Sequence, residues 1–518
     1  MIPGSMMHKP LRLTLAASML ALLGGCAVGP DYQAPKPDLP AAFVSAKETT
    51  APSATEETRW WESFHDPELT SLVERAIARN LDFQIALARL QEARTMEAVV
   101  VGSSLPEVGV SGAAGTGNGS DLTRGRLAPA LASADNRNGA QVTQAVGFDA
   151  GWEIDLFGKL RREIEAAGDD AQAAAAARSE TLVTLIADVV RAYFDQRGLQ
   201  MRLVALQRGV ATAQQTLDYV QKRYDRGLTN ELDVTLAQRE VSTLEAQLAP
   251  LKAQISAARY TIAILIGQYP EAVDRELAKP AMIPALPESV EAGVPVDLLK
   301  RRPDIAEAER QLAGATARIG VATANLFPQV GVTGAVGWQG LSAATAANPL
   351  IWAVGPQASW SLLDFGTLDA LVDVADLRTK EFALNYKETI LHAVQQVDTA
   401  VDDYSAEQNS LHNLDTALTA SQRSVTLAGE RYDRGLTDFL NVLDAERQQF
   451  ALEQQRAEVI RLAGDSFVAL YKALGGGWPP NEVIPPIRRP DPAFVAAVKR
   501  LAQDPPHDRP PLPPELTH

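Results

Sequence analysis

The seven residues RYDRGLT occur twice in this chain, at 223–229 and again at 431–437. The two copies lie 208 positions apart, and Trp152 matches Trp360 at the same spacing. A repeat on this scale indicates that one structural unit is built twice, and it constrains the fold more than any local pattern does.

The match continues upstream of this region at a spacing of 222. LPEVGVSG at 105–112 matches FPQVGVTG at 327–334, so the first copy carries 14 additional residues after this motif. We therefore interpret the chain as a tandem duplication with repeats at 66–268 and 301–475. Residues 269–300 would form an irregular linker around the middle of the molecule.

Proline shows where long helices are permitted. The chain has 32 prolines but none at 130–249 or 357–478, and proline breaks helix interiors. We predict that each repeat begins with a helix of about 35 residues and ends in an antiparallel helical hairpin, at 159–266 and 366–474. The first arm, 159–225, would be about 100 Å long, which is about three times the hydrocarbon thickness of a bilayer. The hairpins must therefore extend into water.

Short motifs mark the ends of these helices. Asp66-Pro67 is typical of a helix start, and Pro303-Asp304 opens the second repeat. Gly227 and Gly435 supply the left-handed conformation that ends a helix, so each RYDRGLT copy is predicted to be the turn at a hairpin tip. The candidate caps of the returning arms are Thr229 or Asn230 in the first tip and Thr437 or Asp438 in the second.

Apolar residues at mixed three- and four-residue spacings predict the packing seam of the first hairpin. On the outgoing arm they are Leu182, Leu185, Val189 and Tyr193, and on the returning arm Leu232, Leu236, Leu244, Leu248, Leu251 and Ile255.

Four runs of alternating character predict strands at about 104–118, 140–157, 326–341 and 350–365. Apolar residues alternate in them with small or polar ones, as in transmembrane β-strands, although a soluble two-sided sheet is an alternative. Four strands cannot close a barrel, and open strand edges are costly in lipid. If these strands cross a membrane, the chain must oligomerise.

Composition excludes several classes of function. The formal net charge is −16 and the basic residues form no stripe, which argues against nucleic-acid binding. The six histidines are scattered, and we find no metal-binding spacing, nucleophile motif or phosphate loop. We expect neither an enzyme nor a bound cofactor or metal.

The N-terminus has the layout of a bacterial lipoprotein precursor. Residues 1–25 combine basic residues with a short apolar run, which is typical of a signal peptide, and Leu23-Gly24-Gly25-Cys26 resembles a lipobox. Cys26 is the only cysteine in the chain, so it is the candidate lipidation site, and 26–65 would be a lipidated N-terminal segment. An unmodified signal peptide is the alternative. Residues 476–518 are predicted to form a Pro-rich C-terminal tail.

Four patches of the chain resemble the outer membrane factors, the TolC-like proteins, and within them the lipidated NodT-type efflux branch. These patches are Cys26 with Gly29-Pro30-Asp31-Tyr32; Trp60-Trp61 with Phe64, Asp66-Pro67 and Leu69; Arg302-Pro303-Asp304-Ile305 through Phe327-Pro328; and Asn441-Val442-Leu443-Asp444-Ala445. The resemblance covers nearly the whole chain from Cys26 to about Gly477.

This resemblance implies a mixed α and β, mainly helical fold. Each protomer would contribute four transmembrane strands and two long coiled-coil hairpins. A homotrimer would form a twelve-stranded β-barrel continuous with a periplasmic α-helical barrel, in the outer membrane of a Gram-negative bacterium. The implied function is passive export of small molecules, such as drugs, with a periplasmic adaptor and an inner-membrane pump of RND type. A duct for type I protein secretion is the alternative, and a periplasmic coiled coil without a pore is a more distant one.

The resemblance also assigns residues to sites. Those matching the adaptor-docking tips are Arg226, Gly227, Leu228 and Thr229, with Arg434, Gly435, Leu436 and Thr437 in the second tip. Leu440 and Asp444 match the residues that close the periplasmic end, with Arg447 and Tyr432 nearby. Leu440 and Asp444 are four positions apart and share one helix face. The alternatives are that Leu440 belongs to the packing seam and that Asp444 pairs with Arg447 or Arg456.

Overall fold

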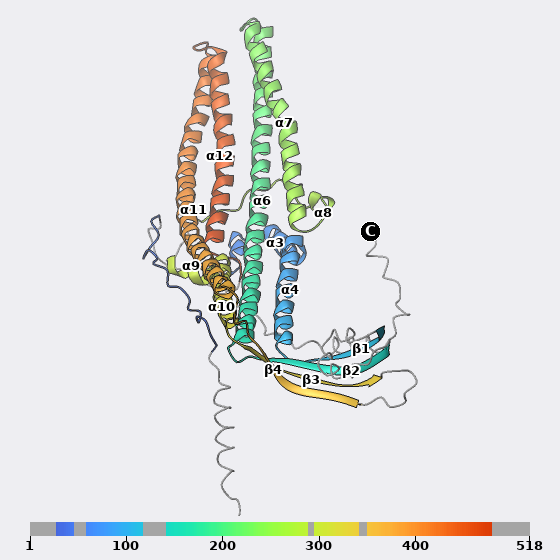
Figure 1. Ribbon diagram of the computed structural model, residues 1–518. Coiled ribbons are helices and arrows are strands. Elements are labelled where there is room, and N and C mark those ends of the chain that lie inside the picture. Colours follow the sequence, from blue (N-terminus) through green and yellow to red (C-terminus); the bar gives the residue numbers. More distant parts are fainter. Residues whose placement is uncertain (1–26, 46–57, 118–140, 288–294, 341–349, 479–518) are drawn as a thin grey trace, which may run out of the picture. The chain divides into compact units, whose positions relative to one another are not determined.

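The computed structural model describes residues 27–45, 58–117, 141–287, 295–340 and 350–478 (Figure 1). The expected signal peptide, Cys26 and the tail beyond residue 478 lie outside the described residues.

The two repeats contain the same elements in the same order. The first has α3 (Pro67–Arg79), α4 (Leu81–Ser103), β1 (Glu107–Gly117), β2 (Gln141–Ile154), α6 (Lys159–Asp225) and α7 (Glu231–Leu265). The second has α9 (Pro295–Arg301), α10 (Pro303–Ala324), β3 (Gln329–Gly340), β4 (Leu350–Ser359), α11 (Thr367–Asp433) and α12 (Phe439–Ala473). The 3-10 helix Trp60–Phe64 precedes the first repeat, and α8 (Glu271–Asp274) follows it. The long helices therefore begin and end within a residue or two of the positions that the sequence predicts.

The opening helix of the first repeat differs from the prediction, because the expected helix of about 35 residues is broken at Asn80. In the second repeat α10 begins at Pro303, as predicted, after the extended residue Arg302, but it has only 22 residues. Both residues bind the end of their own hairpin: the Asn80 side chain donates to the Leu265 carbonyl at 2.9 Å, and the Arg302 guanidinium donates to the Ala473 carbonyl at 2.8 Å. The two contacts are repeat equivalents, because Asn80 and Arg302 are 222 positions apart and Leu265 and Ala473 are 208 positions apart. A hydrogen bond to the far end of each repeat thus stabilises the start of α4 and of α10.

The linker at 269–300 is also less irregular than expected, because α8 and the seven-residue α9 lie within it. Proline opens α9, which is favourable at a first helical position.

The four strands form one antiparallel sheet in the order β1-β2-β3-β4. Strand β4 ends at Ser359, six residues before the predicted end at 365, and Asp364 accepts hydrogen bonds from the amides of Gly366 and Leu368 at the start of α11. The register places most of the apolar residues of the four strands on one face: Val110 pairs with Phe148, which pairs in turn with Val336. Since side chains alternate along a strand, small and polar residues occupy the other face.

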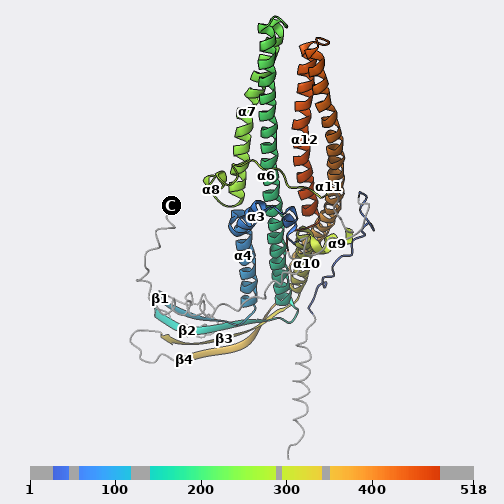
Figure 2. The same ribbon diagram turned by 180° about the vertical axis from the view of Figure 1, so that it is seen from behind.

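The helices follow the same order as the strands. Near the sheet, α4 packs on α6, α6 on α10, and α10 on α11 (Figures 1 and 2). The contact between α6 and α10 joins the two repeats. Further from the sheet the repeats meet again where α12 packs against α6. No described helix is long and apolar enough to cross a membrane.

An aromatic cluster fills the junction between the two repeats. Trp60 stacks on Tyr471 with ring centroids 5.2 Å apart, and Phe64 contacts both Phe194 and Phe467 at 5.2 Å. Trp60, Phe64, Phe194 and Phe467 are all buried, so the short helix at Trp60–Phe64 fastens α6 of one repeat to α12 of the other.

The seam of the first hairpin is largely as predicted. Most of its predicted residues are buried or half-buried, but Leu232 is 63% exposed. Leu232 is the second residue of α7 and lies next to the hairpin tip. Pro250 lies inside α7 without ending the helix.

An N-terminal strap, residues 27–45, runs along the contact between α6 and α10. The Val28 amide donates to the Phe157 carbonyl at 3.0 Å, and the buried Arg162 donates to the Asp31 carboxylate at 2.6 Å. A β-carbon on Gly29 would lie 2.4 Å from the α-carbon of Gly320, so the strap fits there only because both positions are glycine.

The two hairpin tips differ in how the returning helix is capped, which gives a matched test. The Asn230 side chain accepts a hydrogen bond from the Asp233 amide at 3.1 Å, whereas Asp438 caps α12 without a side-chain hydrogen bond. Asn230→Ala should therefore cost about 1 kcal/mol, which corresponds to local amide exchange about five-fold faster at the start of α7. Asp438→Ala should change exchange at the start of α12 little. Hydrogen–deuterium exchange measures both tips, and an equal acceleration would contradict this account.

Candidate functional site: a polar sheet face and two hairpin tips

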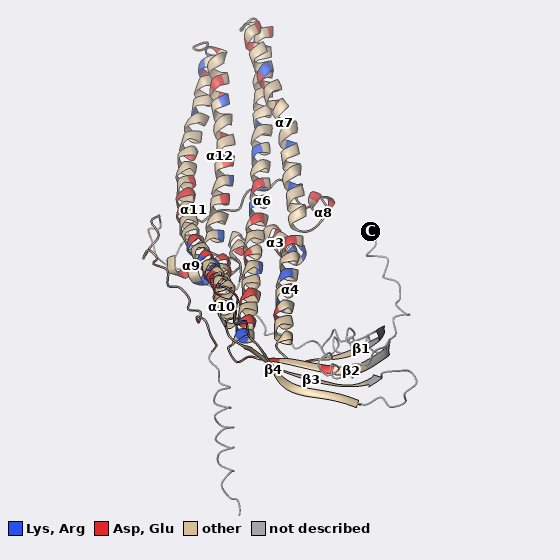
Figure 3. Cartoon of the chain, in the orientation of Figure 1, with Lys and Arg blue, Asp and Glu red and all other residues tan. Residues whose placement is uncertain are grey.

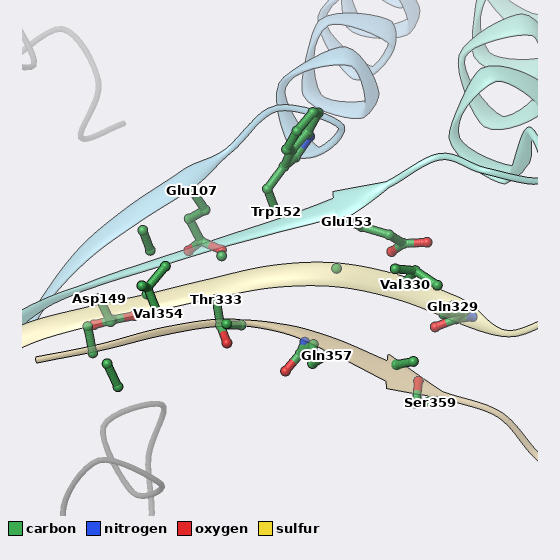
Figure 4. A pocket seen from close by; sticks show the side chains of 18 of the residues that line it. Glu107, Asp149, Trp152, Glu153, Gln329, Val330, Thr333, Val354, Gln357 and Ser359 are labelled. Carbon is green, nitrogen blue, oxygen red and sulfur yellow. The ribbon is translucent and has the colours of Figure 1, made fainter. Parts of the chain in front are cut away.

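The polar face of the sheet surrounds a hollow of about 730 Å³ (Figure 4). Glu107, Asp149, Glu153, Thr333 and Gln357 line it, together with glycine, alanine and the larger apolar residues Leu105, Trp152, Val330 and Val354. The four strands contain no Lys or Arg, and Figure 3 shows most of the charged residues on the helices. The charged residues that line this hollow are therefore all acidic.

Asp149 is held within the wall rather than extended from it. The Ser111 hydroxyl donates to its carboxylate at 3.3 Å. Gly109, directly opposite in the register, leaves the space that the carboxylate occupies, because a β-carbon there would lie 3.3 Å from Oδ1.

The opposite face of the sheet is apolar and exposed. Phe148 is 52% exposed and Trp352 is 72% exposed, and Val110, Val354 and Trp338 lie on the same face. A contiguous apolar surface of this kind marks a contact with a membrane or another protein.

Two tryptophans lie where the sheet meets the helices. The Trp152 indole donates to the Ser104 carbonyl at 3.1 Å, and the Trp360 indole donates to the Leu326 carbonyl at 3.0 Å. The two bonds are repeat equivalents, and tryptophan is typical of the boundary between membrane and water.

The hairpin tips have the same geometry in both repeats. Gly227 and Gly435 have φ values of +70° and +67°. The amides of Leu228 and Leu436 each donate a hydrogen bond of 2.9 Å to the carbonyl of the residue five positions earlier. This is a Schellman turn, which needs the left-handed residue that glycine supplies. The predicted tip residues other than the half-buried Thr229 and Thr437 are exposed. An arginine and a leucine are therefore presented to solvent at each tip.

Leu440 and Asp444 lie on an exposed face of α12. Leu440 is 57% exposed, so within the protomer it is not part of the packing seam. The local partners considered for Asp444 are bound elsewhere: Arg447 pairs with Glu240, and Arg456 pairs with Asp415. Among the described residues, Asp444 has no ion-pair partner.

Tyr432 and Arg447 lie on the other side, between the two hairpins. The Tyr432 hydroxyl is 3.3 Å from the Thr229 hydroxyl and 3.4 Å from the Asp233 carboxylate, and burial raises the pKa of Tyr432, which keeps its proton. Arg447 donates through Nε to Glu240 at 2.7 Å. These two residues connect the second hairpin to the first rather than facing the side where Leu440 and Asp444 lie.

Sequence reasoning missed the first-hairpin partners in this connection. Glu240 is buried beside Val241, and Thr216 donates to Glu446 at 2.8 Å. A carboxylate within an apolar seam is a sequence signal that could have identified Glu240; Thr216 carries none.

The comparisons with known proteins agree with this geometry. The family described as Outer membrane efflux protein matches residues 72–268 and 294–476. The chain belongs to this family. The two matched ranges correspond to the two repeats. The chain therefore has the mainly helical, tandem-repeat fold of the outer membrane channels of this family.

Individual relatives are similar over most of their length. Nodulation protein T of Rhizobium leguminosarum bv. trifolii is 30% identical over 461 residues, covering 89% of this chain and 96% of that protein. The toluene efflux pump outer membrane protein TtgC of Pseudomonas putida is 30% identical over 482 residues, covering 90% and 95%. The solved structure of the outer-membrane channel OprN is 33% identical with a TM-score of 0.79, covering 88% of this chain and all of that one.

This efflux-family chain also contains an acidic hollow where its repeats meet. Glu307 on α10 is half-buried and faces Glu180 on α6, with Asp304 on its own helix and His392 on α11. Burial, reinforced by the neighbouring carboxylates Glu180 and Asp304, raises the pKa of Glu307 to about 7. Gln311 donates to Glu307 at 2.9 Å.

This hollow predicts a pH-dependent stability. Because the folded-state pKa of Glu307 lies above its ordinary value near 4.5, its contribution is most favourable below about pH 4.5 and is lost as pH rises through 7. Glu307→Gln should remove this loss and stabilise the protein at pH 8 by about 1–2 kcal/mol. This is less than the free energy that corresponds to the whole pKa shift, because the carboxylate keeps contact with water. The advantage should shrink towards pH 5.

Thermal unfolding of both proteins between pH 5 and 8 measures this difference. Glu381→Gln, which changes an exposed carboxylate on α11, is the matched control and should show no such trend. A Glu307→Gln advantage that is constant with pH would contradict the assignment.

Proposed function

We propose that this protein is a trimeric outer membrane channel that passively exports small molecules within a tripartite efflux system. One observation carries the proposal: a single sheet has a mainly apolar face and an opposite face of small, polar and acidic residues, in register across all four strands. Such a sheet suits lipid on one side and water on the other.

The edges of this sheet support assembly into a trimer. Strands β1 and β4 each have one side without a strand partner among the described residues, and lipid does not tolerate unpaired backbone groups. Three copies supply twelve strands, which exceeds the eight of the smallest membrane barrels. The hairpins would then enclose a periplasmic tunnel.

The tips provide the surface on which an adaptor would dock. They present Arg226, Leu228, Arg434 and Leu436 to solvent on two turns of identical sequence. Through this adaptor the channel would receive substrates from an inner-membrane pump of RND type. The lipid on Cys26 would anchor the chain to the outer membrane.

In this proposal Leu440 and Asp444 close the periplasmic end. Three copies of an exposed leucine and an unpaired carboxylate would converge there, giving an apolar constriction beside a site that attracts cations. Tyr432 and Arg447 would hold the closed arrangement by fastening α11 and α12 to the first hairpin.

The purified lipoprotein, reconstituted in planar bilayers, tests the channel itself. We expect discrete conducting steps from an oligomer that resists dissociation in unboiled detergent gels. A monomeric protein without conductance would overturn the proposed function.

Leu440→Ala combined with Asp444→Ala should raise single-channel conductance, because both the apolar constriction and the carboxylates are removed. Leu232→Ala, at the equivalent exposed position of the first repeat, is the matched control and should leave conductance near that of the parent. If the two proteins conduct alike, the gate assignment is wrong.

Gly435→Trp should abolish drug export while leaving oligomers in the membrane, because a bulky ring would block adaptor docking. The position is open to solvent but has positive φ, so the substitution also strains the turn. Gly435→Asn separates the two effects, since asparagine adopts this conformation readily, and it should retain export. Drug susceptibility of cells that carry each variant is the measurement, and normal resistance with Gly435→Trp would count against docking at this tip.

A further inference from the structure

A second hollow, of about 310 Å³, lies between the two hairpins at the linker that joins the repeats. We call it the linker hollow, and it is bounded by residues within 200–208 of α6, 418–422 of α11, 453–457 of α12 and 280–282 of the linker. A hollow of this size suits a small molecule. None of the residues assigned to the proposed gate, tips or membrane sheet lines it.

Three helices give the linker hollow a mainly apolar wall. Met201, Val204 and Arg208 are spaced three and four residues apart on α6, so they lie on one face of that helix. Leu418 on α11 is half-buried at the same hollow, and Ala457 on α12 is buried. Apart from the arginine at its edge, the side that α6 presents is therefore suited to a hydrocarbon surface.

Close contacts between α6 and α12 hold this hollow open. A β-carbon on Gly198 would lie 2.9 Å from the Arg461 side chain, and one on Gly209 would lie 2.9 Å from the Phe450 ring. Along both helices these two levels lie on either side of the residues that line the hollow. Because the helices already touch at both levels, they cannot move closer between them, and the hollow is part of the packed structure.

Buried side chains of α6 fix the wall that the linker forms. Gln200, which is 2% exposed, donates to the Leu277 carbonyl at 2.8 Å and accepts from the Ala281 amide at 3.3 Å. Arg197 is also buried and donates to the Lys279 carbonyl at 3.0 Å. These bonds hold the linker against α6, so this wall does not depend on a ligand.

The charged residues at the linker hollow are Arg208, Arg456 and Glu453. Arg456 is paired with Asp415, and Glu453 lies one turn from Arg456 on the same helix, where its charge is offset. Arg208 is exposed on α6, and none of the described residues forms an ion pair or a hydrogen bond with its side chain. An unpaired cation therefore lies beside an apolar hollow.

We propose that the linker hollow binds a small organic anion, an aromatic carboxylate whose ring packs in the hollow and whose carboxylate pairs with Arg208. The planar guanidinium of arginine matches a carboxylate with two hydrogen bonds. Met201 and Met282 come from two different walls, and methionine adapts to irregular apolar shapes, so both pack on a flat ring. A ligand there contacts both hairpins and the linker, and its binding opposes their separation.

Methionine methyl NMR of the purified lipoprotein in zwitterionic nanodiscs tests this site. Four of the seven methionines lie in residues 1–25, and the other three are Met96, Met201 and Met282. Naphthoate, a two-ring aromatic carboxylate, should shift the methyl signals of Met201 and Met282 and reach saturation. Met96 is exposed on α4 and does not line the hollow, so its signal should not move.

Two outcomes of this titration would overturn the proposal. Equal shifts of all three methyl signals would show general adsorption to apolar surface. The absence of a saturable shift at Met201 and Met282 would show that the hollow does not take the ligand, including the case in which protein already fills it.

Substitution of Arg208 tests the role of its charge. Arg208→Gln should weaken naphthoate binding about ten-fold, because a charge-assisted contact is lost, and Arg208→Lys should retain most of the affinity. Arg239→Gln changes another exposed arginine that has no ion-pair partner in the described part of the chain. It is the matched control and should bind like the parent. Unchanged affinity with Arg208→Gln would overturn the assignment.

The charge of the ligand is tested in the same titration. Neutral naphthamide should bind the parent about ten-fold more weakly than naphthoate, and the cation naphthylmethylamine more weakly still. If the cation binds as tightly as the carboxylate, Glu453 rather than Arg208 directs binding and the proposal is wrong. Val204→Phe fills the hollow from α6 and should abolish the response, whereas normal binding by this variant would place the ligand elsewhere.

These measurements do not depend on the proposed channel. Binding is read from methyl signals without export or conductance, so failure of the channel assignment leaves the ligand site testable. Arg208→Gln should conduct like the parent in planar bilayers, because Arg208 lies outside the proposed gate. Loss of conductance in this variant would mean that Arg208 serves the channel rather than a ligand.

Discussion

Backbone hydrogen bonding at the two edges of a four-stranded sheet is the constraint on which the rest of this structure depends. Lipid offers no partner to an unpaired amide or carbonyl, so strands β1 and β4 require other strands. The apolar outer face, the acidic inner wall and the duplicated helices all make sense once the sheet is one segment of a closed cylinder. The internal duplication would reduce the number of different contacts that the proposed trimer needs, because the packing within a chain could be repeated between chains.

The hairpins extend away from the sheet into water, where contacts between side chains hold the helices together. Near the sheet, ion pairs such as Arg310 with Asp169 join α6 and α10. Towards the tips, an apolar cluster that includes Val241 and Phe439 joins the two hairpins. Polar contacts lie beside this cluster, such as Arg447 with Glu240. Both kinds of contact therefore hold the hairpins together along their length.

Much of this fold could be predicted because it is encoded in local patterns. Proline-free windows and glycine turns delimit α6 and α7, and period-two alternation assigns the faces of the strands. The boundary at Arg302 follows from Pro303-Asp304, but the break at Asn80 could not be predicted in this way, since its side chain binds a carbonyl at the far end of the repeat. The same limit applies to the candidate gate. The shared helix face of Leu440 and Asp444 follows from spacing, but the exposure of Leu440 and the partner of Arg447 depend on how the two hairpins pack against each other.

The N-terminal strap breaks the equivalence of the two repeats. It crosses the contact between α6 and α10 through Arg162 and over Gly320, whose repeat equivalents are Ala370 of α11 and Ala98 of α4. Alanine in place of Arg162 offers no guanidinium to the strap. Alanine in place of Gly320 adds a methyl group where the strap passes. In the proposed trimer a strap would therefore cross the contact between α6 and α10 inside each protomer but not its repeat equivalent between copies. The ring would then have threefold rather than sixfold symmetry.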